Sequence, residues 1–254
     1  MDIDAIQNRI EQAMHCLQQR QYAECRNLCD GVIREIDVIP DAFALRGRAY
    51  FLQADEMKGN SNRKLYMSSL MGEDMSEKLS TISMYCAQAI SDLERAIRTA
   101  GNYPNYEGRI LASYYFYLGL AQTSIATIYS RPINQKVLAS GVDNINAAIK
   151  LDKKNGDLTR QLGLIYEEHL EDYASARKYF ALAIETNKHP FDYLFYSWCC
   201  FALKEISQSE HYYKLGRNVD GNILNYGFVR WMASSSERKQ EQWTKFLEHC
   251  KSVY

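Results

Sequence analysis

The sequence predicts an all-α protein built from stacked pairs of helices. Only 4 Pro and 13 Gly are spread over 254 residues, too few to supply the frequent turns of a many-stranded β protein. Apolar side chains recur at helical spacing along most of the chain. A longer period is also present, because three sets of positions repeat at intervals of 33 and 34 residues. The sets are Ala176, Ser209 and Trp243, then Phe180, Tyr213 and Leu247, then Ala183, Gly216 and Cys250.

The composition is that of an electrically neutral globular protein. Apolar residues make up 46% of the chain and charged residues 24%, and the net charge is −1. Nothing in this balance favours a nucleic-acid or membrane partner, and no apolar run approaches the roughly 18 residues of a membrane-spanning helix. The first residues are acidic and resemble no secretory signal. Seven cysteines without paired spacing indicate free thiols, so we expect a cytoplasmic protein.

We expect one domain of six helical hairpins. The clearest hairpin lies at residues 156–189, where small and aromatic residues alternate at the spacing of two packed helices. The last unit is degenerate, with one apolar helical face typical of an end cap or of a docking helix. The expected units are residues 6–39, 40–104, 105–155, 156–189, 190–223 and 224–254.

The central units are longer than the period. An insertion at residues 58–80 expands the second unit, and its Gly59 and Gly72 interrupt the helical pattern. Asp74-Met75-Ser76-Glu77 then forms a plausible capping box, which predicts a long helix over residues 75–100. Further helices are expected at residues 106–129 and 134–151, with Pro132 ending the first of them.

This register resembles the tetratricopeptide repeat (TPR) family, whose period is about 34 residues. The family's signature positions in residues 156–189 are taken by Leu162-Gly163, Tyr166, Ala176, Phe180 and Ala183, while the helix-ending proline is displaced to Pro190. The resemblance implies a right-handed α-solenoid. It also implies that the first helix of each pair lines a concave groove.

The groove positions that the resemblance implies are mostly apolar or aromatic. They are Phe116, Tyr117, Leu120, Arg160, Gln161, Leu164, Phe191, Leu194, Phe195, Trp198, Phe228 and Met232. A contiguous apolar surface of this kind is normally covered by a partner. We therefore predict binding of another protein or peptide with spaced apolar anchors. The alternative is that these side chains fill a tightly wound core, as apolar stripes at helical spacing usually do.

One branch of the TPR family holds the acidic carboxy termini of chaperones with a basic clamp. Here Ile10 and Met14 stand at the corresponding positions of the first repeat, and Arg48 and Arg160 are isolated. We do not expect binding of chaperone tails.

Catalytic chemistry has no recognisable motif in the sequence. It contains no glycine-rich phosphate loop, no Gly-x-Ser-x-Gly elbow and no His-Glu-x-x-His pair. The candidate metal ligands are His15, Cys16, Cys25 and Cys29, of which the last two share a helical face. The three cysteines also occupy small packing positions of the first repeat, where Cys serves as a compact apolar residue. We expect neither an enzyme nor a bound cofactor or metal.

These observations predict a non-catalytic protein–protein interaction module, such as an adaptor, an assembly factor or a chaperone-like subunit. Its anchors would be Phe116, Tyr117, Phe195 and Trp198. The alternative is a structural subunit that forms homo-oligomers, or docks in a larger complex, through the long central helices at residues 75–100 and 106–129.

Overall fold

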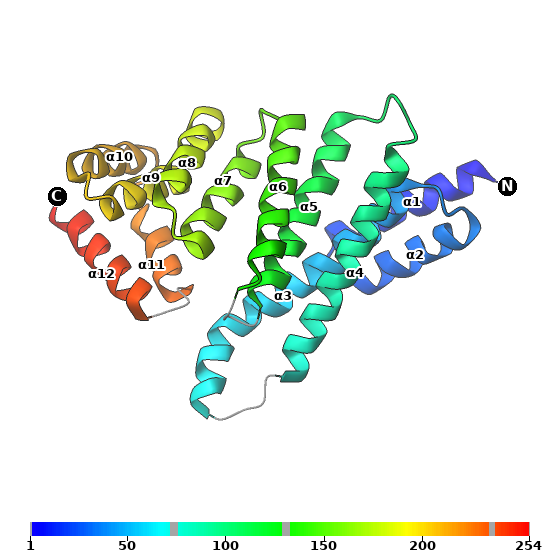
Figure 1. Cartoon of the computed structure of the whole chain (residues 1–254), viewed down its shortest axis with the longest axis horizontal. Coiled ribbons are helices and arrows are strands. Elements are labelled where there is room, and N and C mark those ends of the chain that lie inside the picture. Colours follow the sequence, from blue (N-terminus) through cyan, green and yellow to red (C-terminus); the bar gives the residue numbers. More distant parts are fainter. Residues whose placement is uncertain (1, 72–75, 129–132, 234–236, 254) are drawn as a thin grey trace. The chain divides into compact units, whose positions relative to one another are not determined.

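The computed structural model describes residues 2–71, 76–128, 133–233 and 237–253, without the side chains of residues 59–71, 228 and 230–233. Within these ranges the regular structure consists of twelve α-helices and one π-helical turn, with no strand (Figure 1). None of the helices described is long and apolar enough to cross a bilayer. The chain divides into two compact units, Met1–Asp152 and Lys153–Tyr254. A single domain over the whole chain stays a prediction.

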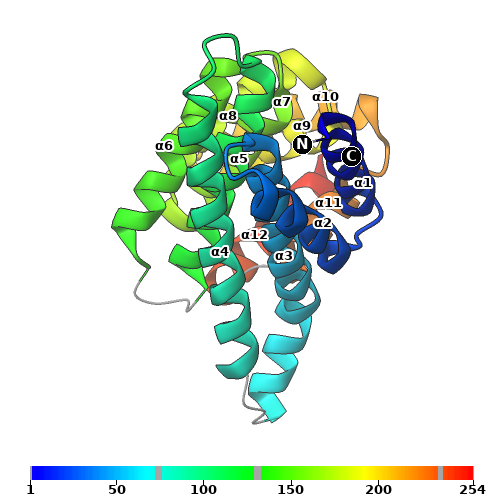
Figure 2. The same cartoon turned by 90° about the vertical axis from the view of Figure 1, so that its right-hand side faces the viewer.

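Unit 1 contains three helix pairs in which neighbours along the chain pack against each other (Figure 2). Its helices are α1 (Ile3–Gln18) and α2 (Tyr22–Glu35), α3 (Pro40–Met71) and α4 (Ser76–Ala100), and α5 (Gly108–Thr127) and α6 (Gln135–Leu151).

Unit 2 contains three more pairs. Its helices are α7 (Gly156–Ile165), extended by the π-helical turn Tyr166–Leu170, and α8 (Tyr173–Asn187), then α9 (Pro190–Ala202) and α10 (Ile206–Val219), then α11 (Leu224–Ala233) and α12 (Glu237–Ser252). Helix α1 begins at Ile3, before the first predicted unit at residues 6–39, and the boundaries of the six repeats stay a prediction.

Local side-chain chemistry explains where several helices begin. An oxygen of Asp2 accepts hydrogen bonds from the backbone N–H groups of Asp4 and Ala5, at 3.1 and 3.2 Å, and so caps α1. Asn134 caps α6 and Asp172 caps α8 in the same way. Proline needs no N–H partner in the first turn of a helix, and Pro190 begins α9.

The insertion lengthens two helices. We expected Gly59 to interrupt the helical pattern, but the backbone of α3 continues to Met71 over 32 residues. One glycine inside a helix costs only about 1 kcal/mol, and α4 packs along α3 as its partner. The predicted helix over residues 75–100 is confirmed as α4, while the capping-box residues Asp74 and Met75 lie outside the described part of the chain.

Close approach between paired helices occurs at glycines. A methyl group added at Gly119 on α5 would lie 2.6 Å from the carbonyl oxygen of Gly141 and 2.6 Å from Cγ1 of Ile145, both on α6. These distances are far below van der Waals contact, so only glycine fits at this crossing. By contrast, a methyl group at Gly31 in α2 would have its nearest contact at 3.6 Å, with the Arg9 guanidinium.

Replacing Gly119 with Ala should therefore lower the free energy of unfolding by about 1–3 kcal/mol through overpacking between α5 and α6. Gly31→Ala is the matched control, because it removes a helical glycine without a clash and should stabilise the protein by up to about 1 kcal/mol. Urea unfolding followed by circular dichroism measures both. Equal shifts for the two variants would contradict the packing described here.

Candidate functional site

Three side chains that the sequence assigns to a groove are buried in a cluster that includes residues of α12. Leu194, Phe195 and Trp198 on α9 are 0%, 0% and 1% exposed. As folded, they belong to the core of unit 2 and form no open surface, because another helix of the same chain covers their apolar stripe. A ligand would reach them only after α12 had left.

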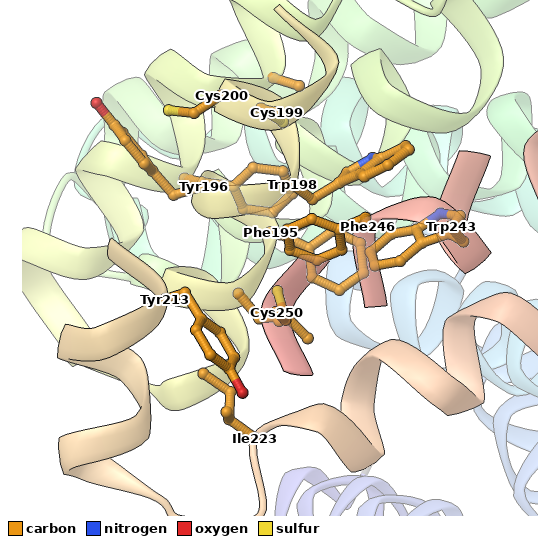
Figure 3. Packing of buried hydrophobic residues seen from close by; sticks show 13 residues of the cluster. Phe195, Tyr196, Trp198, Cys199, Cys200, Tyr213, Ile223, Trp243, Phe246 and Cys250 are labelled. Atoms are coloured by element: carbon orange, nitrogen blue, oxygen red, sulfur yellow. The ribbon is translucent and has the colours of Figure 1, made fainter. Parts of the chain in front are cut away.

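The contact between α9 and α12 is aromatic. The rings of Trp198 and Trp243 are stacked with centroids 4.4 Å apart, and Phe195 lies 5.3 Å from Trp243. Phe246 meets Trp198 edge to face at 5.5 Å. Figure 3 shows these four rings together, with Cys250 one turn further along α12. Such pairs combine a large buried area with a preferred ring geometry.

Polar contacts hold the beginning of α12 to the end of the π-helical turn. The buried Lys239 ammonium donates to the backbone carbonyl oxygens of Glu167 and Glu168 at 3.1 and 2.6 Å, where the helix dipole favours a cation. Arg238 forms an ion pair with Glu171 nearby. The indole N–H of Trp198 donates to a carboxylate oxygen of the buried Glu167 at 3.2 Å. Together with the aromatic contacts, these polar contacts hold α12 against the π-helical turn and α9.

We define the α12 face as the surface of unit 2 that receives this helix. It consists of Phe195, Trp198 and Phe201 on α9, together with the carbonyl oxygens of Glu167 and Glu168.

Arg160, another predicted groove residue, has its charge neutralised inside unit 2. Its guanidinium donates two hydrogen bonds to the fully buried carboxylate of Asp192, at 2.6 and 2.8 Å. A third hydrogen bond reaches Asp157, which is 66% exposed. Burial raises the pKa of Asp192, and the Arg160 cation opposes that shift. The guanidinium therefore links α7 to α9, and we assign it this structural role.

The remaining predicted residues of unit 2 fall into two groups. Gln161, Leu164 and Phe191 are half-buried, and Phe191 stacks on Phe195 with centroids 4.2 Å apart. Phe228 and Met232 lie in α11, but their side chains are outside the described part of the structure.

The predicted residues of unit 1 differ because they stay partly open to solvent. Phe116, Tyr117 and Leu120 on α5 are half-buried. The Tyr117 ring lies 5.4 Å from that of Phe116 and 5.9 Å from that of Phe51 on α3. Helical spacing puts these α5 side chains on one side of the helix.

Arg48 on α3 completes this surface. Its guanidinium carbon lies 4.7 Å from the centre of the Tyr117 ring, a distance at which a cation is attracted to the ring face. Its buried Nε atom has no hydrogen-bond partner, and no carboxylate of the described residues forms an ion pair with it. We call Arg48, Phe116, Tyr117 and Leu120 the Arg48 face.

The candidate metal ligands form no metal site in the structure as described. Cys25 and Cys29 are buried in the core between α1, α2 and α3. No group of three or more His, Cys, Asp or Glu side chains within the described residues is arranged to hold a metal ion. Burial raises the pKa of the Cys16 thiol, which keeps that thiol protonated near neutral pH.

Sequence reasoning missed two parts of this arrangement. Arg48 appeared there only as an isolated cation, because its stacking on Tyr117 joins residues of different repeats. Lys239 is not among the candidate residues named from the sequence, although its distance of four residues from Trp243 places it on the apolar face of the last helix. The four-residue spacing between Lys239 and Trp243 was the signal in the sequence that could have identified Lys239 as a contact residue.

Comparison with known proteins gives structural likeness alone. No protein-family model matches the chain, and neither does any curated protein. A crystal structure of MamA matches with a TM-score of 0.56 and 13% identity, over 89% of this chain and 97% of that one. TTC0263, a thermophilic TPR protein in Thermus thermophilus, matches with a TM-score of 0.53 and 13% identity, over 90% of this chain and 98% of that one. The fold is therefore TPR-like, as the repeat predicted.

Replacing Asp192 with Asn should lower the free energy of unfolding of unit 2 by about 3 kcal/mol, because the half-buried Arg160 then keeps only an exposed partner. Asp157→Asn is the control and should cost less than about 1 kcal/mol, since that carboxylate is solvated. Urea unfolding monitored by tryptophan fluorescence compares them. Similar small losses for both variants would contradict the role assigned to the buried pair.

Proposed function

We propose that this chain, a TPR-like stack of helix pairs, is a non-catalytic protein–protein interaction module that holds an apolar or amphipathic segment of a partner protein. Adaptor, assembly factor and chaperone-like subunit are the roles that fit such a module. Seven free thiols in the described residues support a reducing compartment, so the proposal places the protein in the cytoplasm.

The Arg48 face is the observation that carries this proposal. It presents half-buried aromatic and apolar side chains next to a guanidinium whose buried Nε lacks an acceptor. An unmet buried donor costs free energy, and the apolar side chains gain when water leaves them. A partner segment that brings apolar side chains would cover the apolar residues, and an acceptor on it, a backbone carbonyl included, would pair with the Arg48 guanidinium once that side chain turned toward it. Well-packed aromatic anchors contribute roughly 2 kcal/mol or more each to such an interface.

Phe116→Ser combined with Leu120→Ser should weaken binding of the partner by at least roughly tenfold, because it removes apolar contact at the centre of the surface. The partner is captured from native extract on the immobilised full chain, identified by mass spectrometry, purified and titrated against each variant. Leu182→Ser on α8 is the control, since Leu182 is an exposed apolar residue of unit 2 and does not belong to this face. Equal affinities of the test and control variants would refute the assignment of the Arg48 face.

A structural role remains the second candidate, and the length of the central pair favours it. Helices α3 and α4 contain 32 and 25 residues, more than any other helix described. The cluster of Ala54, Ile82, Cys86 and Ile128, with Met57 and Leu79 packed against it, joins this pair to α5. The helical hairpin beyond that cluster would then form the contact between subunits.

Deletion of residues 59–75 with a short flexible replacement tests the second candidate while keeping Met57 and Leu79. If the pair mediates assembly, light scattering should show an oligomer for the intact chain and a monomer for the shortened one. A monomeric intact chain, or an oligomer of unchanged size after the deletion, would exclude self-association through this hairpin.

A further inference from the structure

We propose that the α12 face is a helix-binding surface, that α12 is its ligand within the same chain, and that the partner it fits is an amphipathic helix with the same recognition pattern. The pattern is a basic residue, an aromatic residue four positions later, a second aromatic three positions after that and a small apolar residue four positions further. This inference rests on the proposed function, since it adds a second surface for an amphipathic partner.

The pattern is that of α12 itself. Lys239, Trp243, Phe246 and Cys250 are separated by four, three and four residues, which places them on one helical face. All four are at most 4% exposed, whereas Glu241, Thr244 and Glu248 on the other side are exposed. An amphipathic helix that presents anchors at this spacing to an apolar groove is a recurring mode of peptide recognition. Here the ligand belongs to the same polypeptide.

The basic residue gives the surface its specificity. Lys239 donates to two backbone carbonyls in the π-helical turn, which follows α7 and precedes α8. Carbonyls at a helix end carry partial negative charge and need donors. A competing helix without a Lys or Arg at this position would leave them without that donor.

The contact leaves polar atoms unsatisfied to an extent not found elsewhere in the described part of the chain. Four buried side-chain polar atoms of the described residues lack a hydrogen-bond partner. One is Nε of Arg48, and the other three lie at or beside α12: Oε1 of Gln242, Nε2 of His249 and the hydroxyl of Tyr173. The His249 nitrogen does face a carboxylate oxygen of Glu210 on α10, at 3.6 Å, which is longer than a hydrogen bond. Tyr173 packs edge to face on Trp198 at 5.9 Å, and His249 lies 5.3 Å from Phe201.

Buried polar atoms in the core of a protein nearly always have a hydrogen-bond partner. At this contact Gln242 and His249 of α12 and Tyr173 of α8 each keep a buried atom without a hydrogen bond, so α12 is held less tightly than its aromatic contacts alone would hold it. We therefore infer that α12 leaves the surface more readily than the neighbouring helices separate. Tethering gives α12 an effective concentration on the order of millimolar, which a partner must overcome.

The test uses the full chain and a synthetic, fluorescently labelled peptide of residues 237–254. Trp243→Ala with Phe246→Ala in the chain weakens its own α12 and should expose the surface. The peptide should then bind at least roughly tenfold more tightly to this variant than to the unmodified chain, where tethered α12 competes. Fluorescence anisotropy measures both affinities. Equal affinities, or no binding to the variant, would overturn the proposal.

Three controls test whether the gain in peptide affinity is specific to the α12 face. Glu248→Ala changes only the exposed side of α12 and should leave peptide affinity as in the unmodified chain. Adding Trp198→Ala to the double variant should abolish the gain, because the surface itself loses its central ring. A peptide that carries Ala in place of Lys239 should bind more weakly than the native peptide; equal binding would remove the basic residue from the pattern.

Hydrogen exchange of the unmodified chain tests the same idea without a destabilised variant. If α12 opens by itself, its amides should exchange faster than those of α9 and α10. If the amides of α12 exchange at the same rate as those of α9, α12 does not open by itself, and the proposal is overturned. Neither experiment involves the Arg48 face, so failure here leaves partner capture by unit 1 intact, and failure of that capture leaves peptide binding to unit 2 unaffected.

Discussion

Close approach of two helices at a residue without a side chain is the constraint on which this fold depends. The same repeat position is glycine in α3, α5 and α7. An added Cβ at Gly47 would lie 2.9 Å from Cγ of Leu93, and one at Gly163 would lie 3.0 Å from Cζ of Phe180. At these two crossings the large side chain comes from the second helix of the pair and packs on the glycine of the first. Other aromatic residues of the first helices give both candidate surfaces their character.

The two units differ in how far the aromatic residues of their first helices are covered. In unit 1 the aromatic residues around Arg48 remain half-buried, with a cation whose hydrogen bonding is incomplete. In unit 2 the equivalent stripe on α9 is covered by α12, and the cation Arg160 is paired with a buried carboxylate. One sequence pattern thus yields an open surface in one unit and a covered surface in the other. The difference arises from α12, which covers Trp198 although it begins more than 30 residues after that residue in the sequence.

Much of the architecture was predictable because its causes are local or periodic. The helix pairs follow from the spacing of apolar residues, and the long α4 follows from that spacing and from the signals at its beginning. The burial of Trp198 was not predictable in this way, since it depends on Trp243 packing back onto α9. The continuation of α3 past Gly59 was also missed, because a single glycine costs a helix only about 1 kcal/mol and need not end it. Among the site residues, periodicity identified candidates but could not distinguish open from covered positions.

The stacked indoles have a spectroscopic consequence. Two of the three tryptophans, Trp198 and Trp243, lie with ring centroids 4.4 Å apart and planes 19° from parallel. Transitions of chromophores this close couple strongly, so the near-ultraviolet dichroism of the unlabelled protein carries a signature of the pair. That signature vanishes when the rings separate. The chain therefore contains its own optical reporter for the state of its carboxy-terminal helix.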